Sequence, residues 1–116
     1  MHIRTLERLV VTALEDIKGK DIVVINTRKL SDLFARLVIA TGDSSRQVRA
    51  LARNVEEKVR EAGGTVLGIE GEEVGEWVLV DCGELVCHVM QPKVRAYYDL
   101  ESLWQGNPKR TAARAP

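Results

Sequence analysis

The stretch LVIATGDSSRQVRALARNVEEKVREAGG, residues 37–64, decides the fold class, because it leads from a strand through a short turn into a capped helix. The β-branched run at its start is typical of a buried strand. Ser44 and Gln47 have the spacing of a capping box, in which each side chain satisfies the backbone N–H of the other residue. Apolar residues then recur on one helical face as far as Gly63-Gly64, where glycine ends the helix.

The segments on either side add one helix and four further strands. Residues 3–17 carry apolar side chains at helical spacing and predict an amphipathic helix. The other segments are short apolar runs, rich in β-branched residues. Cys82-Gly83 is expected to form a tight turn with Gly83 at positive φ, which predicts an antiparallel hairpin. The expected strands are residues 21–26, 37–40, 65–69, 77–81 and 85–90.

The C-terminal part is expected to be helical before it becomes irregular. Pro92 suits the first position of a short helix that runs to Tyr97-Tyr98, and Asp99 can cap one further turn. Residues 106–116 contain Pro, Arg and Ala without apolar periodicity and predict a disordered basic tail. The last turn is expected to bury its three large apolar side chains, those of Leu100, Leu103 and Trp104.

The order of these elements defines the fold class. It reads αββαβββ followed by a C-terminal helical turn, and its alternation is too irregular for a doubly wound parallel sheet. The prediction is an α/β (α+β) fold in which helices pack on a mixed five-stranded sheet. Residues 1–105 are expected to form it as one domain.

Composition excludes several classes of protein. Among 116 residues, seventeen Lys plus Arg balance seventeen Asp plus Glu, which excludes a uniformly basic nucleic-acid coat and a long acidic disordered chain. No apolar run approaches the ~18–20 residues that cross a bilayer, and the N-terminus lacks the apolar stretch of a signal peptide. Cys82 and Cys87 lack metal-type spacing. We therefore expect a cytoplasmic domain without a disulfide framework, a metal site or a cofactor.

The balanced net charge hides an acidic segment. Residues 66–105 carry two basic and eight acidic side chains, whereas residues 1–65 carry twelve basic and nine acidic ones. Tryptophan and tyrosine among carboxylates are the usual composition of a protein-binding hot spot, and opposite potentials speed encounter with a basic partner. The alternative is a solvated acidic surface around core aromatics. Four of the five aromatic residues lie in this segment, namely Trp77, Tyr97, Tyr98 and Trp104.

Trp77 is the residue of this segment best placed to contact a partner. Strand alternation puts Trp77, Leu79 and Asp81 on one face of the sheet, and a face with both an indole and a carboxylate is not expected to be wholly buried. Alternation also directs Cys87 and His88 to opposite faces. His88 is expected to be a structural or interface histidine, because no nucleophile with an orienting acid can be assigned beside it.

A nucleotide-binding or nucleotidyltransferase-like enzyme is the alternative from another class of function. The turn Thr41–Arg46 joins a strand to a helix N-terminus, and such a turn can bind phosphate through backbone N–H groups. Asp43 places negative charge there, however, and neither a Walker pattern nor G-x-G-x-x-G is present. A well-capped helix explains the same residues.

Four arginines fall close to one face of the central helix. They can meet RNA phosphates, or they can form exposed ion pairs along the helix. The arginines are Arg46, Arg49, Arg53 and Arg60, and the candidate acidic partners are Glu56, Glu57 and Glu61.

Several segments carry the motifs of a known family. They are LEDIKGKDI (residues 14–22), VIATGDSSRQV (38–48), GEWVLVDCG (75–83), HVM (88–90) and YYDLESLW (97–104). In these segments, which span nearly all of residues 3–105, the sequence resembles the ribosome silencing factors, also called the Iojap-like family. One departure is FARL at residues 34–37, where many relatives have an A-D-Y-F-like stretch and this chain has no such Asp.

The resemblance implies a small α/β domain with nucleotidyltransferase-like topology and no established catalytic site. It implies binding to ribosomal protein L-fourteen on the large ribosomal subunit, which blocks joining of the small subunit and represses translation. It also implies a link to large-subunit maturation. A minor rRNA contact and a homodimer of the free chain are further expected associations.

The expected binding surface combines aromatic anchors with carboxylates. Trp77 and Tyr98 are expected to be the anchors, because large aromatic side chains dominate hot spots. The carboxylates would supply charge complementarity to a basic ribosomal protein. The expected partner-binding residues are Glu70, Glu73, Glu76, Trp77, Asp81, His88, Tyr98 and Asp99.

Overall fold

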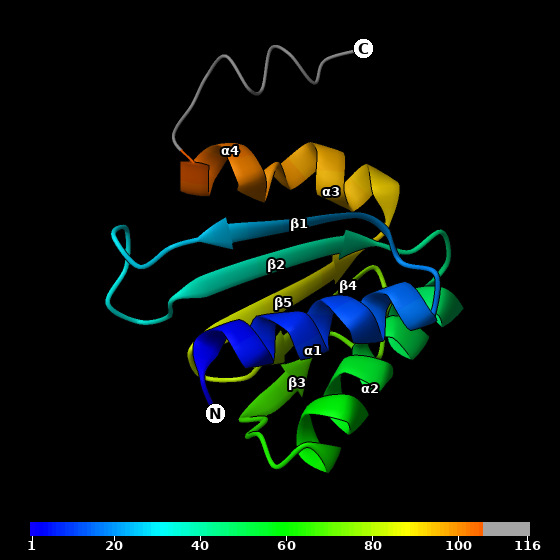
Figure 1. Ribbon diagram of the computed structural model, residues 1–116. Coiled ribbons are helices and arrows are strands. Elements are labelled where there is room, and N and C mark those ends of the chain that lie inside the picture. Colours follow the sequence, from blue (N-terminus) through cyan, green and yellow to red (C-terminus); the bar gives the residue numbers. More distant parts are fainter. Residues whose placement is uncertain (106–116) are drawn as a thin grey trace.

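The computed structural model describes residues 1–105, in which five strands form one mixed sheet with helices on both of its faces (Figure 1). This confirms the predicted α+β fold, with two short C-terminal helices in place of one helix and a single turn. The tail expected at residues 106–116 lies outside the described residues. The elements are α1 (Ile3–Asp16), β1 (Lys20–Asn26), β2 (Arg36–Thr41), α2 (Ser45–Glu61), β3 (Gly68–Glu70), β4 (Trp77–Asp81), β5 (Leu85–Met90), α3 (Pro92–Tyr98) and α4 (Leu100–Gln105).

The strands lie in the order β1-β2-β5-β4-β3, with a parallel pair at the centre of the sheet. β2 and β5 run parallel, whereas the other neighbouring pairs are antiparallel. A parallel pair requires a crossover connection, and α2, β3 and β4 supply it. His88 of β5 thereby pairs with Ile39 on one side and with Leu79 of β4 on the other.

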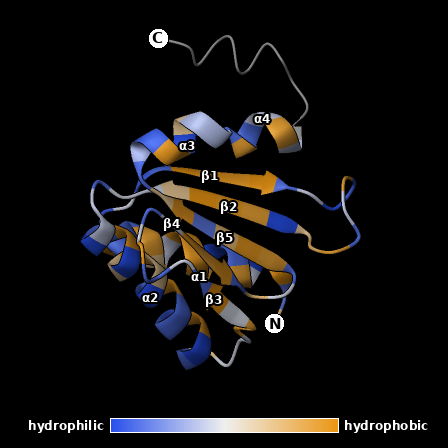
Figure 2. Ribbon diagram, turned by 180° about the vertical axis from the view of Figure 1, so that it is seen from behind, coloured by the Kyte–Doolittle hydropathy of each residue, from blue (hydrophilic) through white to orange (hydrophobic). Residues whose placement is uncertain are grey.

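α1 and α2 lie together on one face of the sheet and bury their apolar stripes against it (Figure 1). Figure 2 shows hydrophobic residues concentrated in the strands and hydrophilic residues along α2. This arrangement follows from the predicted periodicities, because each helix has one apolar face. The buried side chains are Ile3, Leu6, Val10, Ala13 and Leu14 on α1, and Val48, Leu51, Ala52, Val55 and Val59 on α2.

The start of α2 confirms the predicted N-cap but corrects the capping box. Ser44 Oγ accepts a hydrogen bond from the Gln47 N–H at 3.1 Å. The Gln47 side-chain oxygen, however, accepts from the N–H of Asp43 at 2.7 Å and not from Ser44. The reason is that the Gln47 amide also donates to the carbonyl oxygens of Ile17 and Lys18 at 3.3 Å, which draws it toward the turn after α1.

Two predicted boundaries shift in the structure. Residues 65–67 stay outside the ladder because only Gly68–Glu70 pairs with β4, although the Leu67 N–H donates to the Asp81 carbonyl. The two turn residues of the β4–β5 hairpin are Gly83 and Glu84, one position later than expected, because Cys82 donates its N–H to Leu85 and belongs to the paired ends. Gly83 takes the predicted positive φ, at 83°.

α3 and α4 cover the other face of the sheet on the side of β1 and β2. Phe34 and Trp104 meet edge to face with ring centroids 5.0 Å apart. Leu103 is 72% exposed, which corrects the prediction that it is buried. The buried side of α4 is instead centred between Leu100, Glu101 and Trp104, and Leu103 lies away from that centre. The sheet and the two helices form a second apolar cluster on this face. Its buried residues are Ile25, Leu37, Ile39 and Met90, and the side chains packed against them include Val94, Leu100 and Trp104.

A buried ion pair joins α3, α4 and the sheet. Arg95 donates to both carboxylate oxygens of Glu101, from Nε at 3.2 Å and from Nη2 at 3.1 Å. Its third nitrogen, Nη1, donates to Thr41 Oγ1 at 2.8 Å and to the Asp21 carbonyl at 2.6 Å. Glu101 is only 2% exposed. Asp99, the residue between the two helices, has a left-handed conformation with φ 46°. This conformation turns α4 so that the carboxylate of Glu101 reaches Arg95.

Among residues 1–105, no helix is long and apolar enough to cross a membrane.

We expect Arg95→Met to lower the free energy of unfolding by about 3–5 kcal/mol, because it leaves the Glu101 carboxylate buried without its cation. Urea denaturation monitored by circular dichroism measures this change. Arg53→Met is the matched control, since the Arg53–Glu72 pair is largely exposed and such pairs contribute about 0–1 kcal/mol. Equal losses in the two variants would contradict the role of the buried pair.

Candidate protein-binding site

α3 and α4 cover one face of the sheet over β1 and β2. On the same face, β4 and β5 carry side chains that are partly exposed. Along β4, Trp77, Leu79 and Asp81 are partly exposed and alternate with fully buried Val78 and Val80. This confirms the predicted shared face. On β5, Val86 and His88 are partly exposed between buried neighbours. The half of this face formed by β4 and β5 is therefore accessible, and we call it the open half of the sheet.

Three rings gather on the open half. Trp77 Nε1 donates a hydrogen bond to His88 Nδ1 at 2.9 Å, and the centroids of these rings are 5.8 Å apart. Tyr98, at the end of α3, contacts Trp77 with a centroid separation of 4.8 Å. Trp77, His88 and Tyr98 form what we call the aromatic platform. Tyr98 is 53% exposed, so the platform reaches the surface of the molecule.

A cavity of about 290 Å³ adjoins the platform, lined by Glu70, Gly71, Trp77, Leu79 and His88. Gly71 is required there: it has φ +91°, and a Cβ would lie 2.1 Å from the Trp77 carbonyl oxygen. Only glycine allows this close approach of the turn after β3 to the start of β4. The turn therefore sets the wall of the cavity against the indole.

Burial lowers the pKa of His88 to about 4. Desolvation disfavours the charged imidazolium, and the Nδ1 atom is occupied as an acceptor by the indole N–H, which can only donate. His88 is therefore neutral at physiological pH. The exposed carboxylate beside the same cavity is that of Glu70.

The structure brings four of the eight predicted residues together around the platform: Trp77, His88, Tyr98 and Glu70. Asp81 shares the face of Trp77 but lies at the other end of β4, where its carboxylate accepts from the Gly83 N–H at 2.9 Å.

The other three predicted residues lie in connecting segments. Glu76 is exposed next to Trp77, and its carbonyl accepts from the Gln91 N–H. Asp99 directly follows Tyr98. Glu73 is not part of the platform, because its turn is bonded to α2: the Arg49 Nη2 donates to the Glu73 carbonyl at 2.9 Å.

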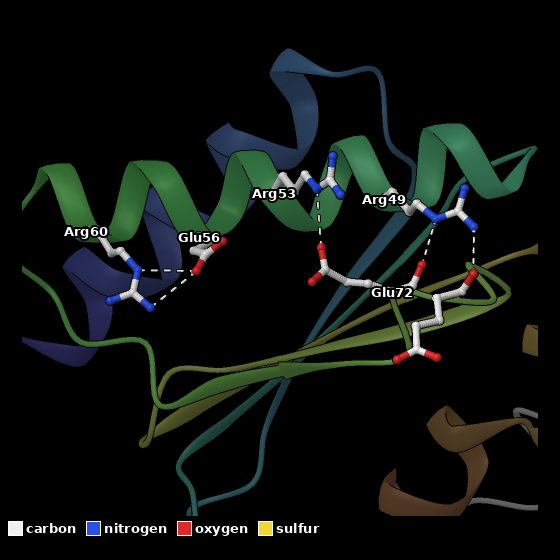
Figure 3. A network of polar contacts seen from close by, with 6 residues as sticks. Arg49, Arg53, Glu56, Arg60 and Glu72 are labelled. Atoms are coloured by element: carbon white, nitrogen blue, oxygen red, sulfur yellow. Dashed lines mark hydrogen bonds and ion pairs between the residues drawn. The ribbon is translucent and has the colours of Figure 1, made fainter.

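The arginines of α2 pair differently from the sequence expectation (Figure 3). Arg60 does pair with Glu56 at 3.2 Å. Arg49, however, donates to the Glu72 carbonyl at 2.7 Å, and Arg53 pairs with the Glu72 carboxylate at 3.3 Å. The crossover places the acidic turn beside α2, so acids far away in the sequence replace the expected helical neighbours as partners.

The turn at residues 41–46 uses its polar groups within the protein. The N–H groups of Asp43 and Gln47 are bonded to Gln47 and Ser44 side-chain oxygens, respectively, and the Asp43 carboxylate pairs with Lys20. These two N–H groups are therefore not available to a phosphate, and the Asp43 carboxylate would repel one. No group of three or more His, Cys, Asp or Glu within the described part of the chain is arranged to hold a metal ion.

Two apolar contributors to the open half were not among the predicted binding residues. Leu79 lines the cavity, and Val86 lies partly exposed on β5. Their positions follow from period-two alternation with Trp77 and His88. That signal was present in the sequence, but it does not reveal that α3 and α4 leave this half accessible.

The fold and the platform together define a small α+β protein whose open sheet half carries aromatic side chains of the kind enriched at protein-binding surfaces. The family model described as "Ribosomal silencing factor during starvation" (RsfS) matches residues 1–115. The chain belongs to this ribosomal silencing factor family, as the motifs predicted.

Individual relatives agree with this assignment. The ribosomal silencing factor RsfS of Chromobacterium violaceum is 55% identical over 115 residues, which cover 99% of this chain and 94% of that protein. A crystal structure of a C. violaceum protein matches with a TM-score of 0.90 at 57% identity, covering 92% of this chain and 89% of that one. The mouse protein named mitochondrial assembly of ribosomal large subunit protein 1 is 30% identical over 102 residues, 83% of this chain and 43% of that protein.

We expect acid to destabilise the fold through His88. Its pKa of about 4 in the folded protein lies below its ordinary value near 6.5, so the unfolded chain binds a proton first and stability falls as the pH drops through this window. The loss amounts to about 2 kcal/mol between pH 7 and pH 5. Urea unfolding of the native protein and of His88→Gln measures the difference in slope. Parallel pH profiles would contradict the assignment.

Proposed function

We propose that this protein represses translation by binding the large ribosomal subunit and excluding the small subunit sterically, with no covalent bond made or broken. The proposed contact is ribosomal protein L-fourteen, the partner implied by the family motifs, and the proposed compartment is the cytoplasm. The observation that carries the proposal is the aromatic platform on an open half of the sheet. The relatives support it through their names, which refer to ribosome silencing and to assembly of a large ribosomal subunit.

The platform has the physical features of an anchor. Trp77 is held in one orientation by its hydrogen bond to His88 and by the contact with Tyr98, so little side-chain entropy is lost when a partner binds. Large aromatic residues in this situation dominate binding energy. A stable contact buries on the order of 1,000 Å² or more, and we propose that this contact extends from the platform over Leu79 and Val86 to Asp81.

Charge complementarity supports a basic partner. Of the eight acidic residues in the segment 66–105, Glu72 and Glu101 are paired within the protein with Arg53 and Arg95. Glu70 at the cavity and Asp81 on the open half form no ion pair with another residue of the range 1–105. Their potential therefore acts on an approaching molecule and raises its association rate.

A second copy of the chain is the competing occupant of the same surface, since a homodimer would cover the platform when no ribosome is present. Sedimentation equilibrium of the free protein, followed by addition of large subunits, distinguishes the two. A nucleotide-dependent enzyme using residues 41–46 is the remaining alternative. Calorimetric titration with ATP and Mg²⁺ tests it, because an enzyme of that class requires nucleotide binding.

We expect Trp77→Ala to weaken binding to purified large ribosomal subunits by about thirtyfold or more, the equivalent of ~2 kcal/mol. Co-sedimentation across a range of subunit concentrations measures the affinity, and a subunit-joining assay measures the loss of exclusion. Leu30→Ala is a matched control, because Leu30 is an exposed apolar residue of the β1–β2 connection. Undiminished binding by a folded Trp77→Ala protein would remove Trp77 from the site.

We expect the paired substitutions Glu70→Lys and Asp81→Lys to slow association with large subunits by about tenfold at low salt, with a much smaller effect at high salt. Stopped-flow measurement with a fluorescent label gives the rate. Glu57→Lys with Glu61→Lys, on α2, changes the net charge equally at another surface and controls for long-range effects. The same slowing in both variants would contradict a localised acidic surface.

A further inference from the structure

His88 has one ring nitrogen that is used and one that is not. Nδ1 accepts the indole N–H of Trp77 at 2.9 Å. For Nε2, no hydrogen-bond partner is found among the residues that the structure describes, and His88 borders the 290 Å³ cavity. Nε2 is the ring nitrogen farther from the backbone, and His88 is partly exposed on β5. The imidazole therefore borders the cavity with one nitrogen that has no partner among the described residues.

The indole N–H of Trp77 determines whether Nε2 of His88 is a donor or an acceptor. A tryptophan N–H can only donate, so the nitrogen that faces it must be the unprotonated acceptor of the imidazole. A neutral imidazole carries its single proton on the other nitrogen. Burial keeps the ring neutral, as its lowered pKa indicates. The contact between Trp77 and His88 therefore leaves an N–H donor at Nε2.

We propose that Trp77 locks His88 in the tautomer protonated at Nε2, and that this N–H binds a carbonyl oxygen of the docking partner. The inference rests on the proposed function, since it assigns the contact made at the same surface. His88 is the residue that touches the partner through this bond. Trp77 has a positioning role in addition to its role as an apolar anchor.

The surroundings favour a neutral acceptor. Glu70 lines the same cavity, and its carboxylate would repel a carboxylate of the partner at this short range. A backbone or side-chain amide carbonyl carries no net charge and fits a donor that is itself uncharged. A partner that placed an N–H at this point would leave two donors facing each other, which disfavours it strongly. The locked tautomer thereby selects the register in which the partner docks.

The tautomer can be tested on the free protein, independently of any ribosome. Long-range ¹⁵N–¹H correlation spectra of the imidazole distinguish a proton on Nε2 from one on Nδ1. We expect a single Nε2-protonated form in the native protein and a mixture of tautomers in Trp77→Phe, which keeps an aromatic ring but lacks the indole N–H. A native protein protonated on Nδ1, or an unchanged tautomer in Trp77→Phe, would overturn the locking role.

Two substitutions separate the two nitrogens of His88 in the binding reaction. A glutamine can place an amide N–H near the position of Nε2, whereas an asparagine can place its oxygen near Nδ1 but has no donor at the Nε2 position. We expect His88→Asn to bind purified large subunits about tenfold more weakly than His88→Gln, because only glutamine keeps a donor at the Nε2 position. Thermal unfolding of both variants identifies any loss of fold.

The outcomes distinguish this inference from the proposed function on which it rests. If native protein binds large subunits and the two variants bind equally, the donor role of Nε2 is wrong and the proposed function stands. If native protein does not bind large subunits, the proposed function and the partner contact of Nε2 are both wrong, whichever tautomer the imidazole has. Weaker binding by folded His88→Asn than by folded His88→Gln supports the inference.

Discussion

The buried ion pair between Arg95 and Glu101 is the interaction that keeps the open half of the sheet accessible. It fixes α3 against α4 and joins both to β1 and β2 through the Asp21 carbonyl and Thr41. Because the two helices are held on this side, they cover the β1 and β2 half of the sheet and leave the β4 and β5 half open. The same anchorage positions Tyr98, the last residue of α3, against Trp77.

The open half gains its character from simple alternation along two strands. Residues of one parity on β4 and β5 enter the core beneath α1 and α2, and residues of the other parity face outward. Pairing of Leu79 with His88 places Trp77 diagonally next to the imidazole, which lets one hydrogen bond fix two rings. A surface built on a sheet is rigid, because the paired backbone fixes the positions of its side chains. Such rigidity suits a protein proposed to act by occupying space.

Some carboxylates of the segment 66–105 form ion pairs within the protein, whereas others face solvent. The turn after β3 contains several carboxylates, yet Glu72 serves to attach that turn to α2 through Arg53, with Arg49 bonded to backbone carbonyls beside it. Figure 3 shows these arginines along one side of α2. Glu70, at the other end of the turn, faces the aromatic platform instead. The acidity of the segment 66–105 therefore includes structural carboxylates that a composition count does not separate from those of the open half.

The local structure and the family could both be predicted from the amino-acid sequence. Apolar period, the Ser44 cap and the glycines at turns specify α1, α2 and the β4–β5 hairpin, because these features act between residues close in the chain. The sequence also predicted Trp77, His88 and Tyr98 as binding residues. The three-dimensional fold brings these three together, bonds the Glu73 carbonyl to α2, and leaves Leu103 exposed while Glu101 is buried. The reason is that strand order and helix rotation depend on contacts between residues distant in sequence. Local sequence patterns do not predict such contacts.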